Sequence, residues 1–183
     1  MIKNISISSN TAEVKSRIER QIEIMRQPKT ALQQMTVQLF QSVMQNFREE
    51  GTDKAKWEQL SLITKFIRRH RQNAPNKKGV IKILQDKGML RQSIYPETGE
   101  DYASVSTNLK YAKKMQFGGV SEASEVVIAP YKRKDGTKVR GFVMHLKGGH
   151  KIPARPFLTI REKNKKAIIE IARKWFFEKG KEK

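Results

Sequence analysis

An amphipathic stripe in residues 29–50 limits what the N-terminal half of this chain can fold into. Apolar side chains recur there at intervals of three and four residues, which places them on one face of an α-helix. Methionine fills gaps in packed cores, so we expect this face to pack in the core or against another helix and not to bind a ligand. The stripe consists of Leu32, Met35, Leu39, Phe40, Val43, Met44 and Phe47.

A second, shorter stripe precedes this one and predicts another helix. Asn10 or Thr11 can cap that helix, with Glu13 near its third position to complete a capping box. Pro28 breaks the periodicity between the two helices, because proline has no backbone N–H to donate. The residues of the shorter stripe are Val14, Ile18, Ile22 and Met25.

Shorter elements are predicted in the middle of the chain. One short helix should begin at about Ser61, and another should contain Leu84. Residues 101–108 alternate well enough for a strand, after an extended segment at residues 92–96. Residues 111–119 predict a short helix whose C-terminus is closed by Gly118 and Gly119.

The clearest local signal lies in residues 124–146. Two β-rich runs flank Asp135–Gly136, a dipeptide suited to a tight hairpin turn with positive φ. Lysine and arginine crowd both sides of the turn, so we expect an exposed, protruding ribbon. The last segment predicts an amphipathic helix with a lysine-rich polar face and with Ile168, Ile169, Ala172, Trp175 and Phe176 on its apolar side. The predicted fold is therefore α+β, with a helical N-terminal half, a small antiparallel sheet with a long basic β-hairpin, and a C-terminal amphipathic helix.

The net charge is the strongest signal in the composition. Among 183 residues, 38 are lysine or arginine and 18 are aspartate or glutamate, which gives +20 at neutral pH. The excess is spread through the chain and does not belong to one basic tail. Such a field attracts polyanions such as nucleic acid, and the attraction weakens steeply with salt. The alternative is a soluble basic protein paired with an acidic neighbour.

Two basic stretches are the candidate contacts for DNA or another anionic partner. One follows the helix near Ser61 and contains Asn, Pro and Gly breakers, which fit a solvated, mobile loop equally well. The other is the hairpin tip, where charge alone gives contact with the nucleic-acid backbone and no sequence readout. The candidates are Arg68, Arg69, Arg71, Lys77, Lys78, Lys132, Arg133, Lys134 and Lys138.

Catalysis and cofactor binding are not indicated. His70, His145 and His150 are scattered, whereas zinc sites need three or four converging ligands. Acidic residues occur mostly singly among basic ones, so paired carboxylates for acid–base or two-metal chemistry are not evident. The sequence has no phosphate-binding glycine loop, no nucleophile elbow and no cysteine. We therefore expect a protein that is not an enzyme and that has no cofactor or metal.

The length of the chain favours a single domain, and its short apolar runs indicate that it does not span a membrane. At 183 residues the chain is long enough to bury a proper core. No apolar run approaches the roughly 18 residues that a bilayer span needs. The N-terminus lacks the apolar core of a signal peptide, and the lack of cysteine fits synthesis in a reducing cytoplasm.

Four short motifs follow one another between about residues 40 and 175. Their residues are Phe47, Trp57, Leu60 and Thr64 in the first stretch; Leu84, Gly88, Leu90, Arg91, Ser93 and Ile94 in the second; Tyr111, Ala112, Gln116, Phe117, Gly118 and Gly119 in the third; and Pro153, Ala154, Arg155, Pro156, Phe157 and Leu158 in the fourth. Taken in this order, the four stretches resemble the virion morphogenesis (tail completion) proteins of Mu-like phages. Two positions depart from that family's pattern, because Lys87 stands where threonine is usual and Met115 where histidine is usual.

The resemblance implies a structural protein of the tail or neck, made in the host cytoplasm and carried in the virion. It would complete the tail and take part in head–tail joining as a homo-oligomeric ring, in contact with the tail tube, the terminator and connector proteins. DNA passes through that junction, so a basic ring could also contact phosphates. We divide the chain into an N-terminal helical arm, residues 1–50, and a tail-completion-like α+β domain, residues 51–183, which together form one continuous domain. The alternative functions are a nonspecific DNA-binding protein of a phage or mobile element and, third, a nuclease with an unrecognised site.

The segment from Pro153 to Leu158 is expected to be a rigid lead-in to the C-terminal helix. Two prolines fix φ at nearby positions and remove two amide donors, which holds the segment extended. Phe157 and Leu158 would anchor it in the core. Arg155 presents a fork suited to a carboxylate or to a cluster of carbonyls. We expect it to form an ion pair, either buried within its own subunit or across a subunit interface.

Overall fold

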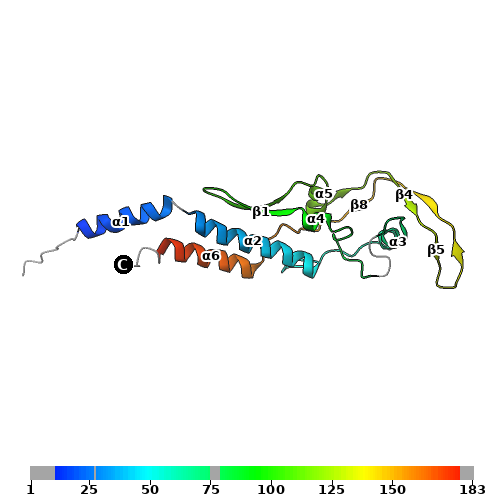
Figure 1. Ribbon diagram of the computed structural model, residues 1–183, viewed down its shortest axis with the longest axis horizontal. Helices are drawn as coiled ribbons and strands as arrows, with labels where there is room; N and C mark the ends of the chain where they lie inside the picture. The colour runs from blue at the N-terminus through cyan, green and yellow to red at the C-terminus, as the bar shows by residue number, and fades with distance from the viewer. Residues whose placement is uncertain (1–10, 27, 75–78, 178–183) are drawn as a thin grey trace, which may run out of the picture.

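Helix α2 (Lys29–Glu49) is the element around which the chain is arranged. Helix α6 (Glu162–Phe177) and a ribbon of β1 (Ile94–Thr98) and β2 (Ala103–Thr107) both pack on it, and α6 runs in the opposite direction to α2 (Figure 1). The computed structural model describes residues 11–26, 28–74 and 79–177. In the described part, no helix is long and apolar enough to cross a membrane.

The apolar stripe of α2 packs in the core, as predicted. Val43 and Phe47 are buried, and Phe40 and Met44 pack against the same cluster. The rest of that cluster comes from segments far away in the sequence: Trp57, Leu60, Ile83, Leu84, Leu90, Ile94, Ala112 and Phe157. The stripe therefore organises the loops, the β1–β2 ribbon and the lead-in to α6 around one side of α2.

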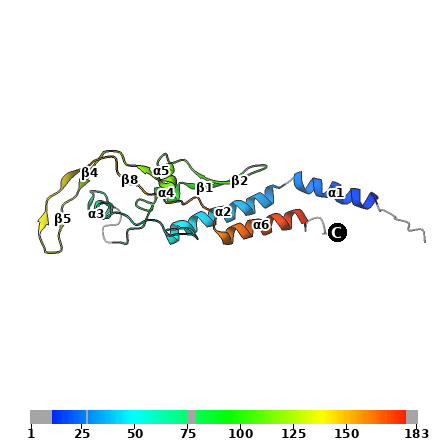
Figure 2. The same ribbon diagram turned by 180° about the vertical axis from the view of Figure 1, so that it is seen from behind.

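Helix α1 (Thr11–Arg26) forms as predicted, but its apolar stripe is not covered. Val14, Ile18 and Ile22 are 55%, 54% and 46% exposed. The side chain of Met25 lies outside what the structure describes. Helix α1 extends away from the body at one end of an elongated molecule, as both Figure 1 and Figure 2 show, so the stripe faces solvent.

The short helices follow the sequence signals in two cases and depart from them in one. Helix α3 (Leu62–His70) is capped by the Ser61 hydroxyl, which accepts from the Thr64 N–H. Helix α5 (Ala112–Phe117) ends at Gly118, which has a φ of 80°. The helix predicted around Leu84 is wrong, because Leu84 has a φ of 58°, a left-handed conformation that no α-helix contains. A single turn, α4 (Met89–Gln92), forms just after that loop.

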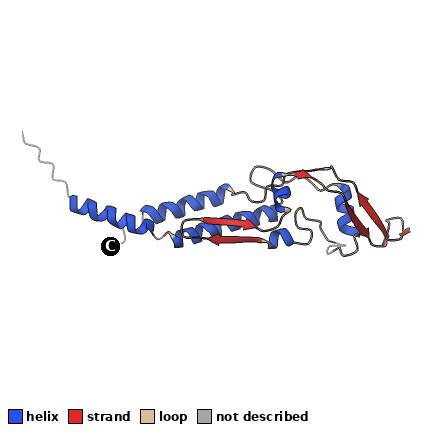
Figure 3. Cartoon of the chain, turned by 90° about the horizontal axis from the view of Figure 1, so that it is seen from above, coloured by secondary structure: helices blue, strands red, loops and turns tan. Residues whose placement is uncertain are grey.

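The predicted basic hairpin forms a long ribbon at the end of the molecule opposite α1 (Figure 3). Its tip turns at Asp135–Gly136, where Gly136 has a φ of 91° and donates its N–H to the Arg133 carbonyl at 3.1 Å. The antiparallel pairs are β3 (Gly119–Val120) with β8 (Lys151–Ile152), β4 (Ser124–Ile128) with β7 (Phe142–Leu146), and β5 (Tyr131–Lys132) with β6 (Lys138–Val139). Together with the helices, these pairs confirm the α+β class.

A bulge bends the ribbon between its inner and outer pairs. The returning arm has one residue more than the outgoing arm between the β4–β7 and β3–β8 pairs. Ser121 of the outgoing arm bonds to two consecutive residues of the returning arm, since its N–H donates to the His150 carbonyl at 2.8 Å and its carbonyl accepts from the Gly149 N–H at 2.9 Å. Gly149 has a φ of 86°, which glycine adopts at little cost.

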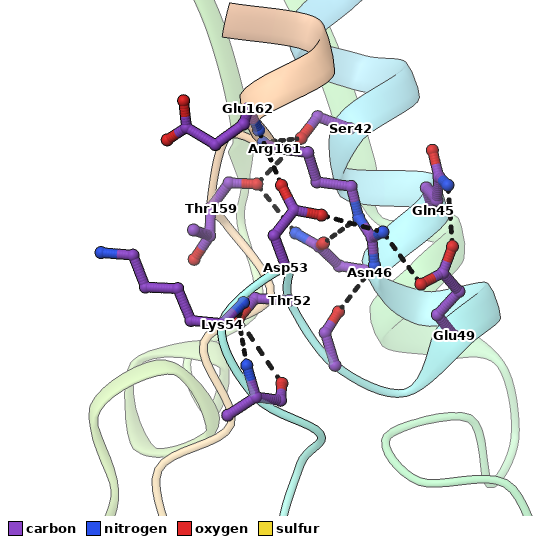
Figure 4. A network of polar contacts seen from close by, with 12 residues as sticks. Ser42, Gln45, Asn46, Glu49, Thr52, Asp53, Lys54, Thr159, Arg161 and Glu162 are labelled. Atoms are coloured by element: carbon purple, nitrogen blue, oxygen red, sulfur yellow. Dashed lines mark hydrogen bonds and ion pairs between the residues drawn. The ribbon is translucent and has the colours of Figure 1, made fainter.

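A buried polar cluster fixes the start of α6 against α2 (Figure 4). The guanidinium of Arg161, whose side chain is 6% exposed, donates to Asn46 Oδ1 at 2.8 Å and to the Gly51 carbonyl at 3.2 Å. It also forms ion pairs with Glu49 at 2.9 Å and Asp53 at 3.2 Å. Because every branch of the guanidinium has a partner, the buried charge is compensated.

The Arg161 cluster makes part of the stability depend on pH. A hydrogen bond from Gln45 and then one from Arg161 lower the pKa of Glu49 below its ordinary value of 4.5. A carboxyl whose pKa is lower in the folded state stabilises the fold above pH 4.5 and loses that contribution as the pH falls through the folded-state pKa.

We therefore predict that Glu49→Gln destabilises the protein at pH 7 and that the difference from wild type shrinks below about pH 4. Urea unfolding at several pH values measures this. The control is Glu100→Gln, at an exposed position in the β1–β2 loop. An equal loss for Glu49→Gln at pH 7 and pH 3 would show that the charge of Glu49 does not stabilise the fold.

Candidate functional site

Residues from the first and last of the four motif stretches meet at one junction beside α2. The Trp57 indole N–H donates to the Pro156 carbonyl at 3.2 Å. Phe47 packs edge-on against Trp57, with ring centroids 5.8 Å apart, and against Phe157 at 5.5 Å. Phe157 is fully buried, so the prediction that it anchors the lead-in to the last helix is confirmed.

The third motif stretch contributes hydrogen bonds to the same junction. Gln116 Oε1 accepts from the N–H groups of both Phe157 and Leu158, each at 3.0 Å. Gly118 has positive φ, and a Cβ there would lie 2.9 Å from the Ile152 carbonyl oxygen. The backbone therefore passes too close at Gly118 for any side chain, and α5 is joined firmly to the lead-in segment.

Arg155 binds carbonyl groups of its own chain. Its Nε donates to the Glu58 carbonyl at 3.0 Å, and a terminal nitrogen donates to the Gln59 carbonyl at 3.5 Å. The residue is 6% exposed. Burial lowers the pKa of the guanidinium, while the nearby Glu58 carboxylate opposes that shift. Among the described residues, these contacts are hydrogen bonds to carbonyls of the same chain and not the ion pair that the sequence led us to expect.

The second motif stretch adds to the core that the junction joins. Leu90 and Ile94 are 3% and 5% exposed and belong to the same apolar cluster as Phe157. Gly88, with a φ of 78°, precedes the single turn α4. Most motif residues therefore hold the fold together and do not form an open site.

Two motif residues at the ends of α5 are among the exceptions, because the side chains of its N-cap, Tyr111, and of its last residue, Phe117, reach the surface. Phe117 is 73% exposed, and Tyr111 is 39% exposed. Tyr111 also lines a cavity of about 310 Å³ with Met115 and Leu90. Within the described residues, no group of three or more His, Asp or Glu side chains is placed to hold a metal ion.

The basic candidates divide into two groups in the structure. Arg68 and Arg71 have partners within the fold, since both contact Asp86, the latter at 2.6 Å, and Arg68 donates to the Lys82 carbonyl at 2.8 Å. Their side chains are only 16% and 19% exposed. Arg69, by contrast, is exposed. Lys77 and Lys78 lie outside the described residues.

The ribbon tip presents its basic side chains to solvent. Asp135 lies among them and is held by the Thr137 N–H at 2.9 Å, which lowers the pKa of that carboxyl. Rings from α3 and β5 stack where Phe66, His70 and Tyr131 meet, with the His70 and Tyr131 centroids 4.4 Å apart. The exposed basic residues of the tip are Lys132, Arg133, Lys134 and Lys138.

The residues that position the junction include three that the sequence analysis did not single out. Ser42 and Asn46 on α2 donate to backbone carbonyls at the end of the lead-in segment, and Arg161 donates to Asn46 Oδ1 and so orients that amide. Asn46 Nδ2 donates to the Phe157 and Thr159 carbonyls at 3.0 and 2.8 Å. The sequence does contain one sign of this role: Ser42 and Asn46 are polar, lie four residues apart and therefore share a helix face next to the apolar stripe.

Comparison with known proteins gives one match. The sequence model of the phage virion morphogenesis family matches residues 9–176. This range includes α1 and the ribbon tip, which the four motif stretches do not reach. Neither the curated proteins nor the solved structures give a match to the chain.

The contacts of Arg155 predict a structural role that can be measured. Arg155→Ala leaves two carbonyls without their donors and should lower the free energy of unfolding by about 2 kcal/mol. Arg133→Ala, at the exposed ribbon tip, is the matched control and should change it by less than about 0.5 kcal/mol. Denaturant unfolding monitored by tryptophan fluorescence, which comes from Trp57 and Trp175, compares the two variants. Unchanged stability with lost assembly would instead place Arg155 at an interface.

Proposed function

The chain belongs to the phage virion morphogenesis family, and from that premise we propose that it completes the tail and takes part in head–tail joining as an oligomeric ring. Membership of the family makes it a virion-associated structural protein. Its proposed partners are further copies of itself, the tail tube or terminator, and the connector proteins of the neck. The proposed place of action is the tail or neck region, after synthesis in the host cytoplasm.

The observation that carries the assembly role is the uncovered stripe on α1. Three aliphatic side chains on one helical face, each about half exposed, extend beyond the body of the molecule. Contiguous apolar surface of this kind marks a protein–protein contact more often than it remains in water. The elongated shape supports the same role, because α1 and the ribbon lie at opposite ends and can reach different neighbours.

A non-enzymatic role is supported by what the motif residues do. The side chains of these residues are engaged with backbone groups or rings of the same chain: Trp57 with Pro156, Gln116 with Phe157, Arg155 with Glu58, and Phe157 with Phe47. An active site instead gathers groups around a space that a substrate can enter. The residues that carry the family resemblance thus mostly build a rigid connection between the helical body and the ribbon.

The mass of the purified protein in solution tests the proposal. We expect light scattering at moderate salt to give a discrete ring, either for the protein alone or after addition of tail tubes. The reason is that a ring buries the α1 stripe, whereas a free chain exposes it. A chain that stays monomeric and does not bind tubes would contradict tail completion.

Nonspecific DNA binding is the second candidate, and the ribbon tip favours it. Lys132, Arg133, Lys134 and Lys138 are exposed around a single carboxylate, Asp135. Such a cluster can contact phosphates without reading sequence. The same surface would also suit DNA that passes through a ring. Tail completion and nonspecific DNA binding therefore differ in whether the protein binds DNA without assembling.

Replacing the four tip residues by alanine tests this second candidate. If they bind phosphates, duplex affinity should fall and the slope of log affinity against log salt should decrease by up to about four, about one per contact. Fluorescence anisotropy with two unrelated duplexes measures the slope. The control replaces four exposed lysines of α6: Lys163, Lys165, Lys166 and Lys174. Equal losses in both variants would assign the binding to net charge and not to the ribbon.

A further inference from the structure

A groove between α2 and α6 is open on the surface near α1. It has a volume of about 720 Å³, and its apolar lining comes from both helices: Ala31, Val37, Ala167, Ile171 and Trp175. Val37, at its rim, is 51% exposed. The neighbouring polar positions are mostly uncharged, so this part of a very basic protein is suited to an apolar occupant.

The exposed stripe of α1 and the groove agree in length. Val14 and Ile22 are eight residues apart, which corresponds to roughly 12 Å along a helix axis. The groove is lined from Thr30 to Gln38 on α2 and from Ala167 to Trp175 on α6, and each of these spans also covers eight steps. The three aliphatic side chains of one α1 therefore fit the length of one groove.

The charges of the two surfaces also suit contact between copies of the chain. Helix α1 carries four basic and three acidic residues, for a net charge of +1. The groove lining carries one of each sign, Lys174 and Glu170. Copies with a charge of +20 repel one another, but screening limits the repulsion to charges within about 8–10 Å of the contact. The lysine-rich face of α6 contributes only Lys174 to this lining, so α1 and the lining itself are close to neutral and are where two copies can meet at low electrostatic cost.

We propose that α1 of one copy lies in the α2–α6 groove of the next copy. This inference rests on the proposed ring and names the contact that closes it. The stripe and the groove are different surfaces of the same chain, so the contact is head-to-tail, and repetition of it generates a ring when the rotation closes. Every copy then donates one helix and receives one.

The absence of cysteine from the sequence makes the contact accessible to cross-linking. We would prepare Ile18→Cys, in the middle of the stripe, and Val37→Cys, at the groove, with different tags. A short bismaleimide is added to each variant alone and to their mixture, with and without tail tubes. The control replaces Val37→Cys by Val80→Cys, because Val80 is 80% exposed and lies away from the groove.

The expected result is a covalent heterodimer in the mixture of Ile18→Cys and Val37→Cys, and none above background with Val80→Cys. The double variant should give a ladder of covalent oligomers. Dimers of Ile18→Cys alone would show that two α1 helices pair with each other. Cross-linking of the double variant within single chains would show that α1 occupies its own groove. Either result, or no cross-link at all, overturns the proposal.

The mass measurement separates this inference from the proposed function. A ring seen by light scattering without the stripe-to-groove cross-link would leave tail completion standing and reject this contact. Ile18→Glu should reduce such a ring to single chains, whereas Val80→Glu should not. A wild-type protein that forms no ring and binds no tubes would reject the function itself.

Discussion

The structure depends on two polar side chains of α2 that hold an irregular stretch of backbone. Residues 153–161 form neither helix nor strand, yet they run through the interior beside Phe47 and Trp57. Buried carbonyls without partners would each cost about 1–3 kcal/mol. Asn46 and Ser42 supply those partners, at Phe157 and Thr159, and Ser42 also accepts from the Arg161 N–H at 2.7 Å. Side chains of a helix thus provide the hydrogen bonds that a neighbouring strand would provide in a sheet.

That arrangement explains how a small core can support so extended a molecule. Once the lead-in segment is fixed on α2, Arg161 fixes the first turn of α6, and Gln116 fixes the end of α5. The ribbon leaves directly from α5 at Gly118 and returns directly into the segment at Pro153, so both of its arms are attached at one place. The family motifs therefore determine where the ribbon is mounted, while its tip is left to make contacts.

Local signals predicted much of this fold, and interactions between distant residues account for what was missed. The α2 stripe, the turn at Asp135–Gly136 and the Gly118 terminus each depend on a few neighbouring residues, and each was predicted. A short helix containing Leu84 was predicted from the sequence. The left-handed conformation of Leu84 instead belongs to a loop where the Ile83 N–H donates to the Glu50 carboxylate, 33 positions away. From the sequence alone, the binding partners of the Arg155 guanidinium could be limited to a carboxylate or a cluster of carbonyls. Its partners, Glu58 and Gln59, are known only once the chain is folded.

The charge distribution gives the two ends of the molecule different physical roles. At physiological salt only charges within about a Debye length affect a contact, so the total of +20 matters less than where the charge lies. The end with α1 and the groove combines exposed aliphatic side chains with a groove lining that holds one charge of each sign, which favours association between like chains. The ribbon tip combines exposed lysine and arginine with a bend and a rigid mount, which favours a polyanion or an acidic surface. In a head-to-tail ring, the first end would make the contacts between subunits, and the second would remain free to reach whatever the ring encloses or caps.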